Sequence, residues 1–325
     1  MQASELFKQS NTILLDGGMG TMLQAAGLKL GARPEELNIT DPALIEGIHG
    51  QYAAAGSRIV NANTFGASAH KLAGSAYTLE QVITAGIENC KRACAPYGAL
   101  TALDVGPLGE LLEPSGTLAF EDAVAEYARI VKAGEAAGAD LIFFETYTDL
   151  YELKAALLAA KENTRLPILA SMSFEAGGRT FTGCTVESFA ATARGLGADA
   201  VGINCSLGPK EIFPMAKRLA EAVPGNFPVF VKPNAGLPRA DGSGYDITPQ
   251  LFALQMKPYR ELHLFAAGGC CGTTPEFIKL LNGTFAGCTP GRPAHRMPSV
   301  LCTPVDTVTV DGITVVGERI NPTGK

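Results

Sequence analysis

Short, continuously apolar runs recur along the chain, and amphipathic segments separate most of them. Eight such runs are evident, at residues 12–15, 58–61, 99–103, 140–144, 168–172, 200–203, 229–231 and 262–266. Their apolar residues are consecutive rather than alternating, which is typical of strands buried on both faces of a parallel sheet. The pattern therefore predicts a series of β-strands joined by covering segments.

Helices are predicted between these strands wherever apolar residues recur at helical spacing. The clearest helical segments are 42–55, 120–137, 150–161, 186–196, 210–222 and 249–259. Glycine follows three of them, as Gly56, Gly138 and Gly197. A glycine in this place can end a helix in the left-handed conformation and turn the chain into the next strand.

Eight βα units within about 290 residues predict an α/β fold, a (β/α)8 TIM barrel over residues 1–290. A doubly wound sheet is the alternative. The barrel is favoured because polar residues gather after the predicted strands, at the end where barrel enzymes carry their chemistry. Residues 291–306 are rich in proline, glycine and basic side chains, which predicts a C-terminal linker.

The last segment, residues 307–325, has a different pattern. A short β-hairpin tail is predicted about Asp311-Gly312. Because no helix pattern covers the strand that follows the linker, we expect residues 307–325 to be the start of a further, truncated domain.

Composition and charge narrow the class of protein. The 325 residues are 46% hydrophobic and 18% charged, which is typical of a globular protein with an ample core. The net charge of −6 argues against nucleic acid or an anionic membrane as the main partner. No run of about 18 apolar residues could span a membrane, and no secretory signal begins the sequence. We therefore expect a cytoplasmic protein without a membrane or nucleic-acid partner.

The eight cysteines are too scattered for a disulfide scaffold. Cys90 and Cys94 are interpreted as structural, and no other candidate ligands lie near Cys184, Cys288 and Cys302 in the sequence. The other three follow the sixth and eighth predicted strands, and are Cys205, Cys270 and Cys271. Strands six and eight are separated by one strand in a barrel, so the three sulfurs can meet at one rim.

Three thiolates from two loops, with no fourth protein ligand evident, predict a zinc site with one open position. The adjacent pair, Cys270 and Cys271, is not expected to form a disulfide, because the ring would be strained. The alternative is two buried small residues beside turn glycines. A three-thiolate zinc suits a substrate thiolate better than activated water, and keeps a thiol of pKa about 8.5 deprotonated yet nucleophilic. The chemistry expected is attack by a substrate sulfur on an electrophilic carbon.

Other polar groups at the same rim suit an amino acid. The predicted substrate-binding residues are Asp16, Gly17, Gly18, Thr21, Asn63, Glu145 and Asn234. Glu145 could receive an ammonium group, and the backbone N–H groups of residues 17–21 a carboxylate. Structural alternatives stand beside these roles: Asp16 as a turn cap and Asn234 as a support for its own loop. No histidine is expected at the rim.

Four motifs resemble those of the homocysteine S-methyltransferase family. They are residues 16–21 (DGGMGT), 202–206 (GINCS), 233–236 (PNAG) and 268–273 (GGCCGT), in the family's order between about residues 12 and 288. The resemblance implies a (β/α)8 barrel in which Cys205, Cys270 and Cys271 hold Zn²⁺. It also implies that homocysteine is the substrate and binds the zinc through its sulfur.

The segment 317–324 (GERINPTG) is similar to the opening of the methyltetrahydrofolate-binding domain in cobalamin-dependent methionine synthases. This similarity implies methylcobalamin as methyl donor, with cobalamin-binding and methyltetrahydrofolate-binding domains on the same or an associated chain as partners. The sequence contains no Asp-x-His-x-x-Gly cobalamin motif, so another domain or protein must supply the cofactor.

Three other functions stay open on the sequence. The methyl donor could be betaine or S-methylmethionine, as in related family members. The barrel could be a non-catalytic, zinc-bound docking module. A barrel lyase that uses Lys232 as a Schiff base is the third.

Overall fold

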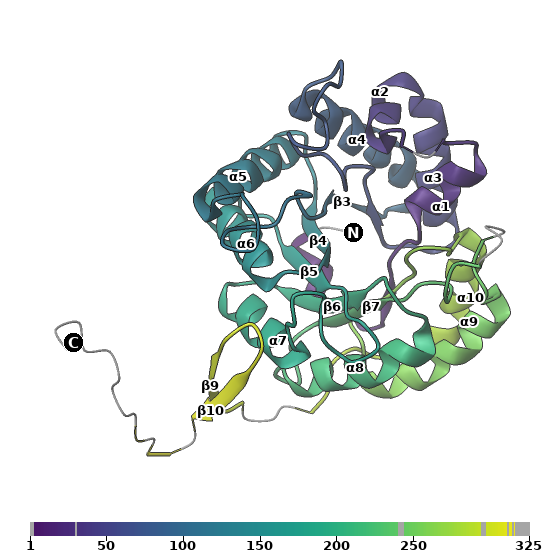
Figure 1. Ribbon diagram of the computed structural model, residues 1–325. Helices are drawn as coiled ribbons and strands as arrows, with labels where there is room; N and C mark the ends of the chain where they lie inside the picture. The colour runs from purple at the N-terminus through teal and green to yellow at the C-terminus, as the bar shows by residue number, and fades with distance from the viewer. Residues whose placement is uncertain are drawn as a thin grey trace.

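Eight parallel strands form the centre of the molecule, and helices surround them (Figure 1). The computed structural model describes residues 3–29, 31–239, 244–293, 297–310, 312, 313 and 315. The strands are β1 (Ile13–Leu14), β2 (Ile59–Asn61), β3 (Leu100–Val105), β4 (Leu141–Tyr147), β5 (Ile168–Met172), β6 (Ala200–Asn204), β7 (Val229–Lys232) and β8 (Ala266–Ala267).

The strand order shows a closed ring. Hydrogen-bonded neighbours run β1-β8-β7-β6-β5-β4-β3-β2, all parallel. A bridge between Leu14 and Ser57, with Arg58 N donating to Leu14 O at 2.7 Å, joins β1 to the start of β2. The predicted (β/α)8 barrel is therefore confirmed over the doubly wound alternative, whose sheet would stay open.

The helices follow the predicted places closely. They are α1 (Met19–Ala25), α2 (Leu37–Thr40), α3 (Pro42–Ala54), α4 (Leu79–Cys94), α5 (Phe120–Ala136), α6 (Leu150–Asn163), α7 (Val186–Gly195), α8 (Pro209–Glu221), α9 (Pro249–Met256) and α10 (Pro275–Phe285). Short 3-10 helices lie at Ala3–Lys8, Pro34–Glu36, Ala95–Tyr97 and Lys257–Leu262. Gly56, Gly138 and Gly197 have φ of 115°, 86° and 88°, so the predicted left-handed turns are confirmed.

Side chains that point into the barrel form a core of their own. Leu100 and Ala102 of β3, Leu141 and Phe143 of β4, and Phe230 of β7 belong to this inner cluster. Because side chains alternate along a strand, the next inward positions are polar residues at the carboxyl ends of the same strands. The fold thus carries a polar layer directly above an apolar one. A second, larger core fills the space between the strands and the helices.

The eighth strand is shorter than predicted. Residues 257–262 form a 3-10 helix, and His263 follows in the left-handed region with φ of 48°. The strand itself covers only Ala266–Ala267, and Phe265 before it also bonds through its backbone to Ile13 and Val229. Leu262 and Leu264 are apolar because they pack into the outer core, so burial alone produced the strand-like pattern that was predicted for 262–266.

A β-hairpin follows the barrel, so the predicted hairpin tail is confirmed, and the turn that the structure describes lies before Asp311-Gly312. Strands β9 (Ser299–Cys302) and β10 (Thr307–Val310) pair antiparallel, so the turn spans residues 303–306 and β9 lies inside the predicted linker. Thr303 and Asp306 hold this turn, with Asp306 N donating to Thr303 Oγ1 at 3.1 Å. The hairpin lies beside α7 (Figure 1), where Thr185 N donates to Pro304 O. Asp311 and the segment 317–325 lie outside the described residues.

No helix of the described ranges has both the length and the apolar character needed to cross a membrane.

The inner core yields a first prediction. Phe143 is fully buried, and its ring packs edge-on against Phe230 with centroids 5.1 Å apart. We expect Phe143→Ala to lower the free energy of unfolding by about 3–5 kcal/mol in urea denaturation, because it leaves a cavity in a close-packed interior. The matched control is Phe181→Ala, which removes a ring that is 74% exposed and should change stability by less than about 0.5 kcal/mol. Equal losses in the two variants would contradict the inner-core assignment.

Candidate active site

The three predicted sulfur ligands meet at the carboxyl end of the barrel. The Sγ atoms of Cys205, Cys270 and Cys271 all lie within 4.8 Å of one another, and those of Cys205 and Cys271 are 3.7 Å apart. In a tetrahedral site with zinc–sulfur bonds of about 2.3 Å, two sulfurs are about 3.8 Å apart. The donor set and its spacing therefore fit a zinc ion. In the part of the chain that the structure describes, this is the one group of three or more such side chains close enough to hold a metal.

A turn with an unusual backbone conformation places Cys205 beside Cys270 and Cys271. Cys205 and Ser206 both adopt left-handed backbone angles, with φ of 63° and 60°. Cys205 N donates to Lys232 O at 3.1 Å, and Leu207 N donates to Cys205 O at 2.7 Å. Left-handed angles cost roughly 1–2 kcal/mol for a residue with a side chain, so the surrounding structure must hold this turn in place.

Hydrogen bonds and close packing hold the adjacent residues Cys270 and Cys271 in place. Cys270 N donates to Pro233 O at 2.8 Å, and Thr273 Oγ1 donates to Cys270 O at 2.7 Å. On the other side, a Cβ atom at Gly18 would lie 2.8 Å from Cys270 O. The absence of a side chain at Gly18 therefore lets the first βα turn approach the cysteines closely.

Four predicted substrate-binding residues are also engaged in structural contacts. A Cβ atom at Gly17 would lie 2.7 Å from Thr273 Oγ1, and Gly18 N donates to that same oxygen at 3.2 Å. Thr21 Oγ1 accepts from Gly272 N at 2.8 Å. Asn63 Nδ2 donates to Pro34 O and Asn38 Oδ1, at 2.8 and 2.9 Å. Packing against the turn that contains Cys270 and Cys271 therefore explains in part why residues 16–21 have this sequence.

Protonation of the cluster is strongly uneven. Hydrogen bonds from Cys205 and then Cys270 lower the pKa of Cys271 to about 3. Hydrogen bonds to Cys270 and Cys271, together with burial, raise the pKa of Cys205. Three crowded sulfurs cannot all ionise by themselves, whereas a bound cation would allow it.

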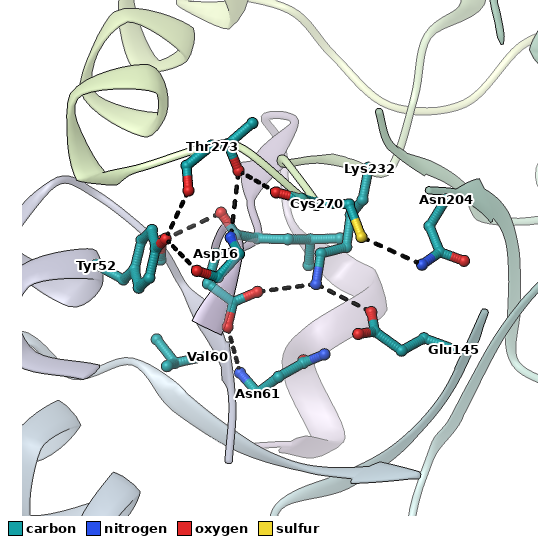
Figure 2. Close-up of polar contacts among 12 residues, drawn as sticks. Asp16, Tyr52, Val60, Asn61, Glu145, Asn204, Lys232, Cys270 and Thr273 are labelled. Carbon is teal, nitrogen blue, oxygen red and sulfur yellow. Dashed lines mark hydrogen bonds and ion pairs between the residues drawn. The ribbon is translucent and has the colours of Figure 1, made fainter. Parts of the chain in front are cut away.

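Asn204 fixes one of the sulfurs. Its Nδ2 donates to Cys270 Sγ at 3.7 Å, as Figure 2 shows, and to Thr146 Oγ1 at 2.7 Å. Its Oδ1 accepts from Thr146 N at 3.0 Å and from Ser171 Oγ at 2.9 Å. The amide is therefore held in one orientation, and groups of this kind orient a metal ligand from behind.

A buried ion-pair network crosses the barrel mouth. Lys232 Nζ lies 2.9 Å from Asp16 Oδ1 and 3.1 Å from Glu145 Oε2, so β7 is joined to the turn after β1 and to β4 (Figure 2). Burial opposes the charge of Lys232, but the nearby carboxylates raise its pKa well above the ordinary value. A Schiff-base lysine must be neutral to attack a carbonyl, so this environment argues against the lyase alternative.

The position of Glu145 depends on a bulge in β4. The register with β5 shifts between Phe144 and Tyr147, and Thr146 has a left-handed φ of 66°. A bulge re-aims the side chains beside it. Burial raises the pKa of Glu145 to about 7, against the opposing charge of Lys232.

A cavity of about 380 Å³ opens over these groups. It is lined by nine of the ten predicted site residues: Asp16, Gly17, Gly18, Thr21, Asn63, Glu145, Cys205, Cys270 and Cys271. Asn234 is buried but does not line the cavity, and its backbone N–H bonds to Leu207 O. Lys232 and Asp104 line it too, although the sequence reasoning did not include them among the site residues. The strand period could have indicated both, since each lies two residues beyond an inward-facing apolar residue.

Comparison with known proteins identifies the family. A family model described as homocysteine S-methyltransferase matches residues 13–285. The chain belongs to the homocysteine S-methyltransferase family. The resemblance drawn from the four motifs is thereby confirmed.

Two longer proteins are similar in sequence to nearly the whole of this chain. Methionine synthases of Mycobacterium tuberculosis and Mycobacterium leprae are each 32% identical to it over 95% of its length. The chain spans 28% of the length of either relative.

Solved structures of the homocysteine methyltransferase MmuM from Escherichia coli have the same fold. The oxidized form matches with a TM-score of 0.74 at 24% identity, covering 86% of this chain and 98% of that one. The metallated form matches with a TM-score of 0.70, at the same identity and coverage.

The ion-pair network yields a second prediction. We expect Lys232→Met to lower the free energy of unfolding by about 3–5 kcal/mol, because two carboxylates would be left buried without their cation. Urea denaturation at neutral pH measures the loss, and the double variant Lys232→Met/Asp16→Asn should recover part of it. The matched control is Lys154→Met on the exposed face of α6, with an expected change below about 1 kcal/mol. An unchanged stability in Lys232→Met would contradict the network.

Proposed function

We propose that this chain binds homocysteine through its sulfur at the three-cysteine centre and presents that sulfur for methylation to methionine. The observation that carries the proposal is the convergence of Cys205, Cys270 and Cys271 within 4.8 Å beside a cavity with buried carboxylates. Membership of the homocysteine S-methyltransferase family supports it independently.

The proposed resident ion is Zn²⁺, held by the three cysteine thiolates with one position left for the substrate. Such an ion supplies one function when bound, which is to keep the homocysteine thiol ionised at neutral pH while leaving the sulfur nucleophilic. The hydrogen bond from Asn204 to Cys270 Sγ holds one ligand in orientation. It also draws electron density from that thiolate, which would offset part of the negative charge of the cluster.

The remainder of the amino acid would lie in the cavity. Glu145 is the proposed receptor of the ammonium group, since Lys232 engages its Oε2 and the side chain lines the cavity. The carboxylate is assigned to the turn at residues 16–21. There Thr21 Oγ1 accepts from Gly272 N, and its own hydroxyl proton remains available as a donor. Asp16 would act through Lys232, and Asn63 and Asn234 would support their loops.

The methyl donor is proposed to be methylcobalamin, carried by another domain or protein. The sulfur lone pair would form the new sulfur–carbon bond, and the electron pair of the broken methyl–donor bond would leave with the donor. Two observations support this donor: the 32% identity to methionine synthases, and the small share of their length that the chain spans. On the same grounds, residues 307–325 are proposed to begin a methyltetrahydrofolate-binding domain, and a cytoplasmic location stays a prediction.

A purely structural zinc module is a weaker explanation of this site. A docking module needs no enclosed cavity, and burying carboxylates beside it costs stability. The cavity with Asp16, Asp104 and Glu145 therefore favours a ligand-binding role.

The metal centre is tested by removing one sulfur. We expect Cys270→Ser to lose stoichiometric zinc and, with it, homocysteine binding in titration calorimetry, while circular dichroism and the melting temperature stay close to those of the parent chain. Cys302→Ser, which changes an exposed cysteine of β9, is the matched control and should keep both. Unfolding of Cys270→Ser would show a structural metal, and retained zinc and homocysteine binding would refute the site.

The donor is tested separately. The zinc-loaded chain with homocysteine should form methionine from free methylcobalamin, and not from S-methylmethionine or betaine, when each is supplied at equal concentration. Methionine is measured by mass spectrometry, with Cys270→Ser as the blank. Faster methionine formation from either other donor would overturn the methylcobalamin assignment, although the sulfur-binding role would stand.

A further inference from the structure

The loop between β7 and α9 folds back over the cysteine centre and carries Tyr245 to it. Pro238 and Tyr245 form an antiparallel bridge, so the two sides of this loop are paired. Asp246 strengthens the pairing, because its N donates to Leu237 O at 3.1 Å and its Oδ1 accepts from Leu237 N at 2.8 Å. Tyr245 is therefore held in place by its neighbours in the loop and not by its own side chain alone.

The ring of Tyr245 covers the turn that follows the cysteine pair. A Cβ atom at Gly272 would lie 2.3 Å from Cγ of that ring, and Gly272 has a left-handed φ of 79°, so only glycine fits there. Tyr245 and Cys271 both line the cavity, and hydrogen bonding joins the Tyr245 hydroxyl to the Cys271 sulfur. Because a phenol is protonated at neutral pH, the hydroxyl donates and the sulfur accepts.

The three sulfurs differ in their exposure and in the donors that reach them from outside the cluster. Cys270 is 8% exposed and accepts from Asn204. Cys205 and Cys271 are both half-buried, and both line the cavity. Among the residues that the structure describes, the Cys205 sulfur hydrogen-bonds only within the cluster, whereas the Cys271 sulfur also accepts from Tyr245. Cys205 and Cys271 thus form a matched pair that differs in one donor.

Alkylation of a ligand cysteine is a side reaction open to such a centre. A metal-bound thiolate keeps part of its nucleophilicity, so a ligand sulfur in the cavity competes with a substrate sulfur for an electrophilic carbon. The side reaction would join Cys271 Sγ to that carbon, and the leaving group would depart with the electron pair of its broken bond. A hydrogen bond engages a sulfur lone pair and draws electron density from it. The Tyr245 hydroxyl therefore slows this reaction while Cys271 keeps its place in the cluster.

We infer that Tyr245 decides which sulfur of the centre reacts: it protects Cys271 from alkylation, so that an electrophilic carbon in the cavity is attacked by the bound substrate thiol instead. The inference deepens the proposed function and rests on it, since only a site that handles such a carbon needs this protection. Tyr245 acts through Cys271 and touches neither the substrate nor the donor, so its role is one of positioning.

The experiment treats the zinc-loaded chain with iodoacetamide. Peptide mass spectrometry measures the initial rate at which each cysteine sulfur gains the carbamidomethyl group as iodide leaves. Tyr245→Phe keeps the ring over Gly272 and removes only the hydroxyl, so we expect alkylation of Cys271 to become about fivefold faster. Cys205 is the internal reference, and its rate should change by less than about twofold. The matched control is Tyr97→Phe, which alters a ring that is 45% exposed and should change neither rate.

Zinc content and a melting curve distinguish protection of Cys271 from a structural role. Tyr245→Phe should keep stoichiometric zinc and a melting temperature within about 2 °C of the parent. An unchanged rate at Cys271, an equal acceleration at Cys205, or loss of zinc from the variant would each overturn the inference. A parent chain that takes up no zinc would refute the proposed function, and the inference with it. Zinc uptake by the parent, with no selective change at Cys271 in the variant, refutes only the role of Tyr245.

Discussion

Three sulfur atoms within 4.8 Å of one another set the main physical constraint on this structure. Thiols that close compete for protons, and their thiolates repel one another, so such a cluster does not form unless the backbone compels it. Two local features let the loops that carry the cysteines approach one another. Cys205 and Ser206 adopt consecutive left-handed conformations, and position 18 is a glycine. The strained turn costs stability, and burial of the two apolar cores below and around the rim offsets that cost.

In the barrel, the local alternation of side chains along each strand brings together residues that are far apart in sequence. Because each strand alternates, a residue two positions beyond an apolar inward residue also points inward, and eight parallel strands end at the same rim. Asp104, Glu145 and Lys232 come from different strands and line one cavity because of this alternation, to which β4 adds its bulge beside Glu145. Asp16 and Asn204 then connect that layer to the first βα turn and to Cys270. The polar layer is thus a product of the fold as much as of the individual residues.

Most of the fold could be predicted from the sequence, because continuous apolar runs and helix-ending glycines are local signals. The eighth strand was placed too early, since the sequence does not distinguish burial of Leu262 and Leu264 against helices from pairing in a sheet. The turn at 303–306 was not foreseen, because it depends on contacts with the start of α7 and not on a strong local signal such as Asp-Gly.

The grouping of the cysteines and the lining of the cavity could be predicted from the sequence, whereas the ion pairs at the barrel mouth could not. Three cysteines after two strands predicted the sulfur cluster that the structure brings together, and nine of the ten predicted site residues line the cavity. The partners of Lys232 could not be foreseen, because Asp16 lies 216 positions away in sequence and the pairing depends on how the barrel closes. The contact of Asn204 with Cys270 could not be foreseen either, since this hydrogen bond depends on a side-chain orientation that no motif encodes.

The hydrogen-bonded turns around the cysteines also determine how the centre would choose among ions. Backbone contacts to residues 207, 233 and 235 hold Cys205, Cys270 and Cys271 in place. Because these turns present three sulfur donors, the chemical softness of sulfur decides which ions the centre would prefer. Thiophilic ions such as Cd²⁺ or Cu⁺ would compete for such a centre, while Mg²⁺ and Ca²⁺, which favour oxygen donors, would not.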